Sequence, residues 1–192
     1  MNVAQQRFFS AEEYLAWEER QTVKHEYLRG EVYEVYAMAG ARDAHVTVAG
    51  NVFALLKSHL RGTPCRTYIA DMKLRVEAAD AYFYPDVFVT CDVRDRASDL
   101  CKSHPLLVVE VLSDSTSGYD RGGKFASYRR LDDLQEYVLI DPEARTVDVF
   151  RRDTTSHWVL HPYAGGAEAE FASLDFRAPL PLIFEDVVPP AT

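Results

Sequence analysis

The feature that most constrains the fold is the run Pro105-Leu-Leu-Val-Val-Glu110-Val-Leu-Ser113. Its leucines and valines follow one another without polar alternation and are rich in β-branching, which is typical of a strand buried on both faces. One carboxylate, Glu110, stands inside this run. Burying an ionised carboxylate without compensation is costly, so proteins tolerate it mainly where a metal, a cation or a reaction requires the charge.

Two further residues complete a pattern with Glu110. Asp86 follows a proline and opens a predicted strand over 86–91, and Lys124 lies near the start of a predicted helix over 120–131. Metal-assisted phosphodiester cleavage needs oxygen ligands and a cation near the phosphate. Asp86 and Glu110 are therefore candidate catalytic residues and ligands for Mg²⁺ or Mn²⁺, and Lys124 is the candidate that positions water or offsets charge. A turn, a half-exposed strand and a solvated lysine would explain each residue singly; their combination supports the site.

The geometry of the lysine is feasible. Glu110 lies about 10 Å back from the end of its strand. Lys124 lies about 6 Å into the following helix. A helix that folds back antiparallel over the sheet brings the amine beside Glu110.

The remaining periodicities predict an α/β protein: a mixed central β-sheet flanked by helices, in a single domain over residues 1–192. A capping box at Ser10 opens a short helix, and the repeated Glu-Val-Tyr at 31–36 predicts a bulged strand. The tail over 178–182 is expected to be an irregular edge segment. The other predicted helix covers 43–60, and the other predicted strands cover 31–38, 65–70, 72–76, 106–112, 136–141, 146–151 and 158–163.

Charge and hydropathy limit the classes of function. The net charge is −9, with 21 basic and 30 acidic side chains, which counts against a protein that coats nucleic acid non-specifically. A nuclease with a local basic patch is compatible, and Arg121, Arg129 and Arg130 around Lys124 are the candidates. No apolar run reaches the ~18 residues of a membrane span, and no signal-peptide pattern opens the chain. We therefore expect a cytoplasmic protein without membrane contact.

Cysteine and histidine spacings give no metal motif. The three cysteines lack a CxxC pair, so we expect neither a disulfide nor a thiolate zinc site, with Cys65 and Cys91 as small core residues. His157 and His161, about 13 Å apart on one strand, cannot share an ion. His45 is expected to be a packed or capping histidine, and a contact to phosphate is the lesser alternative.

The motifs Pro85-Asp86 and Glu110-Val-Leu112 resemble a variant of the PD-(D/E)XK nuclease core, with leucine where the superfamily lysine usually stands. The chain resembles more specifically a bacterial restriction-endonuclease-like family first catalogued as a domain of unknown function, in which the lysine is moved to the next helix, as at Lys124. The resemblance extends over segments 25–31, 38–40, 70–75, 84–87, 108–113 and 137–142, and includes His45.

This resemblance implies a restriction-endonuclease-like fold and metal-dependent hydrolysis of nucleic acid, with DNA as the expected substrate. It also implies a homodimer, for which the tyrosine-rich strand 31–36 is a candidate interface. The family's acidic residue near the first strand would fall on Glu31, our candidate catalytic residue, or on Glu26. Glu34 competes with Glu31 because the Glu-Val-Tyr repeat is duplicated.

Two alternatives remain open. One is a nuclease fold without activity that serves as a binding or regulatory module. The other, more remote, is a P-loop nucleotide-binding protein, because 118–124 fits Gly-x4-Gly-Lys. Phe125 replaces the Ser or Thr that would hold Mg²⁺, and too few residues follow for a parallel NTPase sheet. A serine hydrolase has no support, since no Gly-x-Ser-x-Gly elbow exists.

Overall fold

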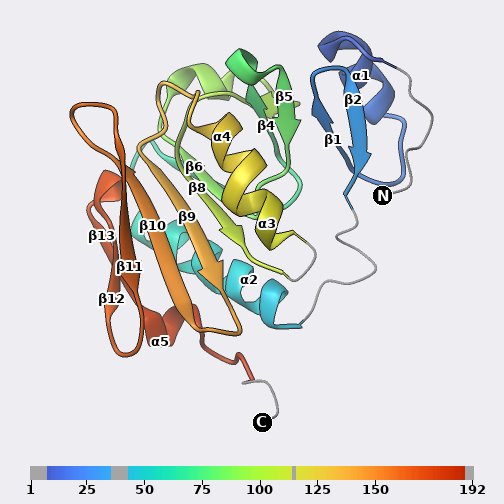
Figure 1. Cartoon of the computed structure of the whole chain (residues 1–192). Coiled ribbons are helices and arrows are strands. Elements are labelled where there is room, and N and C mark those ends of the chain that lie inside the picture. The colour runs from blue at the N-terminus through green and yellow to red at the C-terminus, as the bar shows by residue number, and fades with distance from the viewer. Residues whose placement is uncertain (1–7, 36–42, 114–115, 189–192) are drawn as a thin grey trace.

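The computed structural model describes residues 8–35, 43–113 and 116–188. Its larger sheet has six strands in the order β11-β10-β9-β8-β6-β3 (Figure 1). β8 and β9 run parallel and the other neighbouring pairs run antiparallel, so the sheet is mixed, as predicted. The strands are β3 (Arg66–Ile69), β6 (Val87–Thr90), β8 (Pro105–Val111), β9 (Glu136–Asp141), β10 (Thr146–Arg152) and β11 (Trp158–Tyr163).

A second sheet of five short strands was not predicted as a separate unit. Its order is β2-β1-β5-β4-β7, with β4 and β7 parallel and the other pairs antiparallel. The predicted bulge is absent from the described part of the β1–β2 ladder, and the second Glu-Val-Tyr copy continues into 36–42, outside the described residues. The strands are β1 (His25–Leu28), β2 (Glu31–Glu34), β4 (Lys73–Val76), β5 (Ala81–Phe83) and β7 (Cys101–Lys102).

The central strands of the large sheet, β6, β8 and β9, are buried on both faces, as the apolar run predicted for β8. Val87, Val89 and Val109 pack with helix α2 (Asp43–His59). Phe88 and Val108, the intervening residues, pack on the other face with residues of the second sheet and of the helical segment after β8. Figure 1 shows α2 and that helical segment on opposite faces. No helix in the described part of the chain is long and apolar enough to cross a membrane.

The helical segment after β8 has three parts. It consists of α3 (Ser117–Tyr119), a π-helical turn η3 (Asp120–Lys124) and α4 (Phe125–Tyr128). A β-carbon on Gly123 would lie 2.5 Å from the ring of Tyr119, so a larger residue there would require that ring to move. Because 118–124 is helical, it does not form a phosphate-binding loop, and the P-loop alternative is wrong.

The ends of the chain flank these layers. Helix α1 (Ala11–Glu18) begins at Ser10 with the predicted capping box. The tail is more regular than expected: β13 (Phe176–Pro179) pairs with β12 (Glu168–Phe171), and α5 (Leu180–Ile183) follows. Short 3₁₀ turns η1 (Glu77–Ala79), η2 (Val93–Arg96) and η4 (Ala172–Leu174) connect strands.

The prediction that no disulfide forms is wrong, because Cys65 and Cys91 are bonded. β3 and β6 pair antiparallel with Arg66 opposite Thr90. Extending this register by one residue brings Cys65, which precedes Arg66, opposite Cys91, which follows Thr90. The spacing of the cysteines in the sequence does not indicate this strand pairing. Cys101 is a free thiol.

Candidate nuclease centre

Lys124 lies at the centre of a buried group of carboxylates. Its Nζ lies 3.2 Å from Glu26 Oε1, 3.3 Å from Glu110 Oε1 and 3.4 Å from Asp120 Oδ1. The lysine side chain is only 9% exposed. Because β8, β1 and the π-helical turn each supply part of the group, tertiary packing of these three elements assembles it.

The contact between Lys124 and Glu110 follows from the path of the chain. β8 carries Glu110 toward its carboxyl end, and the helical segment then folds back over the sheet, as the sequence predicted. The hydroxyl of Tyr128, one turn beyond Lys124, donates to Glu110 Oε1 at 3.0 Å. Two groups of one helical segment therefore hold the same carboxylate oxygen.

Burial and charge act in opposite directions at this pair. Burial raises the pKa of Glu110 well above its ordinary value, while the Lys124 ammonium partly opposes this shift. Burial alone would lower the pKa of Lys124, but the charges of Glu110, Glu26 and Asp120 outweigh it and raise that pKa. The lysine is therefore held as an ammonium ion, a donor of hydrogen bonds and not a base.

Asp86 lies beside Glu110 but is more open to solvent. Val87 pairs with Val109, so extending the antiparallel register by one residue brings Asp86 opposite Glu110. Asp86 Oδ2 accepts a hydrogen bond of 2.7 Å from the backbone N–H of Val111. Its side chain is 22% exposed, against 4% for Glu110. The two carboxylates thus differ: one is reachable from outside and the other is enclosed.

The structure brings Glu26, and neither Glu31 nor Glu34, to this group. Glu26 is 8% exposed and its Oε1 also accepts from the backbone N–H of Tyr84 at 3.3 Å. Glu31 and Glu34 are exposed on β2, an edge strand, and Glu31 accepts from the Tyr33 hydroxyl. β1 lies between β2 and β5, and its two middle residues, Glu26 and Tyr27, are both buried.

Two neighbours of the group were not predicted as site residues. His45 Nε2 lies 3.1 Å from Asp86 Oδ1, and burial, which lowers the pKa of His45, is outweighed by Asp86, so that the pKa is raised. Burial raises the pKa of Asp120. The spacing of Asp120 and Lys124, four residues apart, could have indicated their contact on one helical face. No local sequence pattern indicated the pairing of His45 with Asp86.

Comparisons with known proteins identify the family of this chain. Residues 11–180 match the family model described as "Uma2: Putative restriction endonuclease". The chain belongs to the Uma2 family. Two uncharacterized proteins of Synechocystis sp. are 38% and 34% identical to this Uma2 protein over 175 residues each, covering 91% and 90% of the chain and 90% and 97% of the relatives.

A solved structure shows the same fold. The crystal structure of an Anabaena variabilis protein, described as "a putative nuclease belonging to DUF820", has a TM-score of 0.75 with 16% sequence identity. The similarity covers 94% of the Uma2 chain and 99% of that protein. The predicted restriction-endonuclease-like α/β fold is confirmed.

The carboxylates of this Uma2 site have the chemistry that a hard divalent cation prefers, although no three of them bring ligand atoms within 4.8 Å of one another in the described residues. Asp86, Glu110, Glu26 and Asp120 supply four carboxylates against the single ammonium of Lys124. Carboxylate oxygens are the ligands that Mg²⁺ and Mn²⁺ prefer. Asp86 and Glu110, on neighbouring strands, could hold such an ion, with Glu26 next to them.

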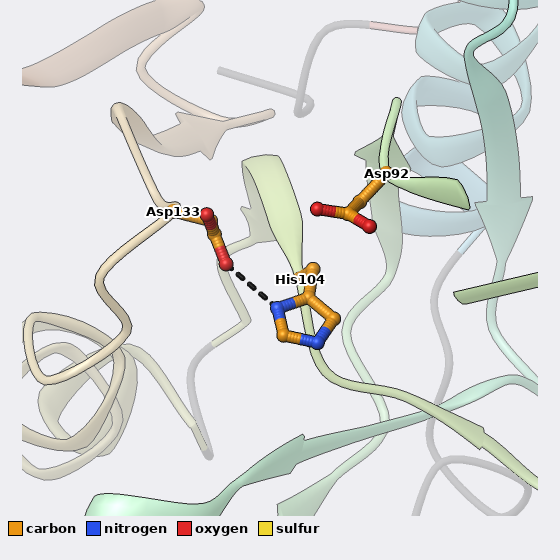
Figure 2. A group of neighbouring side chains, drawn as sticks. All are labelled: Asp92, His104 and Asp133. Carbon is orange, nitrogen blue, oxygen red and sulfur yellow. Dashed lines mark hydrogen bonds and ion pairs between the residues drawn. The ribbon is translucent and has the colours of Figure 1, made fainter. Parts of the chain in front are cut away.

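Another group of possible ligands lies elsewhere in the Uma2 fold. Figure 2 shows Asp92, His104 and Asp133, whose ligand atoms lie within 4.8 Å of one another. They stand beyond the end of β6 and before β8 and β9, at the opposite end of these strands from Asp86 and Glu110. The Arg94 guanidinium already contacts Asp92 at 2.5 Å and Asp133 at 3.4 Å. This group is therefore an ion-pair network, separate from the candidate nuclease centre.

Proposed function

We propose that this Uma2 protein is a metal-dependent nuclease that hydrolyses phosphodiester bonds of nucleic acid, with DNA as its substrate. The observation that carries the proposal is the convergence of Asp86, Glu110 and Lys124, from three separate elements, at one place. The family description and the nuclease-like fold agree with it.

The residues of the centre would have separate roles in metal binding and in contact with the phosphate. Asp86 and Glu110 would hold Mg²⁺ or Mn²⁺, with Glu26 completing the set in place of Glu31. The bound ion would supply Lewis-acid polarisation of the phosphate and activation of the attacking water. Lys124, kept charged by its three carboxylates, would donate to a phosphate oxygen and stabilise the charge that develops there.

The phosphate backbone would need cations near Asp86, the open side of the site. Arg129 and Arg130 are exposed, although Arg129 stacks on Phe125, and Arg121 is paired with Asp148 at 3.2 Å. Lys24 and Lys73 each lie 5.5 Å from the ring of Tyr84, two residues before Asp86. We propose that these cations form the local basic patch that the overall charge of the chain lacks.

A homodimer is part of the proposal. The edge strand β2 exposes Tyr33 and leaves one side of its backbone unpaired within the described sheet. Co-purification of differently tagged chains tests it. Failure of the tagged chains to co-elute after co-expression would contradict the dimer.

Plasmid nicking tests the activity. We expect the wild type to convert supercoiled DNA to the open-circular form with Mn²⁺, and Glu110→Gln and Lys124→Met each to reduce the rate by at least about 10²-fold. Asp92→Asn, which removes a carboxylate outside the centre, is the matched control and should nick like wild type. A wild type that binds Mn²⁺ but nicks neither DNA nor RNA would contradict the proposal and favour the inactive binding module.

A further inference from the structure

A buried carboxylate outside the centre has hydrogen bonds that its position in α1 does not explain. Glu18 is the last residue of this helix, and its side chain is 4% exposed. Its Oε1 accepts from the backbone N–H of His25 at 2.8 Å and from the Tyr84 hydroxyl at 2.9 Å. Its Oε2 lies 3.0 Å from His25 Nδ1. One carboxylate therefore joins two segments that lie far apart in the sequence.

Each of these two segments carries an acid of the candidate centre. His25 directly precedes Glu26, and Tyr84 is followed by Pro85 and Asp86. Tyr84 makes a second connection, because its backbone N–H donates to Glu26 Oε1 at 3.3 Å. Glu18 thus binds His25, which precedes Glu26, and the hydroxyl of Tyr84, whose backbone N–H contacts Glu26.

The surroundings keep this connection rigid. Tyr84 is 8% exposed, and burial raises the pKa of its hydroxyl, so that it stays protonated and donates. Pro85 fixes the backbone between Tyr84 and Asp86, since proline restricts its own φ and the conformation of the residue before it. The backbone position of Tyr84 therefore constrains that of Asp86.

We propose that Glu18 and Tyr84 are positioning residues of the nuclease centre, which set the placement of Glu26 relative to Asp86. The inference rests on the proposed function. Neither residue would touch the metal or the substrate. Groups that orient metal ligands typically change metal affinity by about 10–100-fold when they are removed.

Tyr84→Phe tests the inference against a matched control. The substitution removes only the hydroxyl, and Tyr27→Phe does the same at another buried tyrosine, whose hydroxyl lies within donating distance of Asp80 Oδ2 (3.0 Å) and of the Phe9 carbonyl oxygen (3.2 Å). We expect both variants to lower the melting temperature by about 2–4 °C through one lost hydrogen bond. Only Tyr84→Phe should weaken Mn²⁺ binding, by about 10-fold. Equal Mn²⁺ affinity in the two variants would overturn the inference.

Two substitutions of Glu18 test whether its acceptor oxygen is what matters for Mn²⁺ binding. Gln keeps an oxygen that can accept from His25 N–H and from the Tyr84 hydroxyl, so Glu18→Gln should bind Mn²⁺ within about threefold of wild type. Leu has a similar size but no acceptor, and Glu18→Leu should lose at least about 10-fold. Equal affinities in these two variants would also count against the inference.

The wild type and a double variant separate this inference from the proposed function. Mn²⁺ binding that is lost in Asp86→Asn/Glu110→Gln but unchanged in Tyr84→Phe overturns the positioning role alone. Absence of Mn²⁺ binding by the wild type overturns the proposed function and the positioning role together.

Discussion

Nζ of Lys124 lies 3.3 Å from Oε1 of Glu110, although one residue belongs to the helical segment and the other to the centre of the sheet. The same ammonium is shared with Glu26 and Asp120. Three buried carboxylates thus depend on one cation. The stability of the fold and the chemistry of the site are therefore coupled through Lys124.

Replacing Lys124 by methionine should destabilise the metal-free protein. The variant leaves buried carboxylates without their cation, so we expect the free energy of unfolding at pH 7 to fall by about 3–5 kcal/mol. Urea denaturation with and without Mn²⁺ measures this loss and its partial recovery by the ion. Lys57→Met, at an exposed position of α2, is the control and should change stability by less than about 0.5 kcal/mol. Equal stability of the two variants would contradict the account.

The protonation of Glu110 should contribute to the pH dependence of the free energy of unfolding. Burial raises the pKa of Glu110 above its ordinary value of 4.5, so the folded protein binds this proton more tightly than the unfolded chain does. Its stabilising contribution is complete below the ordinary pKa and is lost as the pH rises through the raised value. Relative to Glu110→Gln, the wild type should lose at most about 1.4 kcal/mol per pH unit in that window. Parallel pH profiles of the two proteins in urea denaturation would refute this prediction.

Metal binding should release a proton from Glu110. A carboxylate must be ionised to bind a divalent ion, so Mn²⁺ displaces the proton that burial favours. Calorimetry in buffers of different ionisation enthalpy counts the protons released. We expect release by the wild type to exceed that by Glu110→Gln at the same pH. Identical proton release would place the titrating group elsewhere.

The disulfide should support the fold without affecting the site. Cys65 and Cys91 are 26 residues apart in sequence, and a crosslink over such a loop stabilises by about 2–4 kcal/mol. Cys65→Ser/Cys91→Ser should therefore melt at a lower temperature. Because Cys91 and Asp86 flank opposite ends of β6, Mn²⁺ affinity should stay within about twofold of wild type. A large loss of affinity would show that the two ends of the strand are coupled.

Local sequence patterns predicted the individual helices and strands of this fold better than they predicted which of these elements contact one another. The apolar run around Glu110 identified a strand buried on both faces, and the fold-back of the next helix brought Lys124 to it. The choice between Glu26 and Glu31 depends on which strand is the edge of the second sheet. The duplicated Glu-Val-Tyr does not indicate which strand that is.

Contacts set by tertiary pairing were missed for the same reason. The Cys65–Cys91 bond requires β3 to lie beside β6 in a particular register. The contact of His45 with Asp86 joins the first turn of α2 to the start of β6. Neither arrangement has a local sequence pattern, because both depend on packing between elements that are distant along the chain.

The most direct test of the central claim, that Asp86 and Glu110 hold a divalent ion, is Mn²⁺ titration by calorimetry. It compares the wild type with Asp86→Asn/Glu110→Gln and with Asp92→Asn/Asp133→Asn, which likewise replaces two carboxyl groups by amides, at the other end of the strands. We predict that the wild type and the Asp92/Asp133 variant bind Mn²⁺ and that the Asp86/Glu110 variant does not. Binding that survives in the Asp86/Glu110 variant, or is lost in the other, would contradict the account.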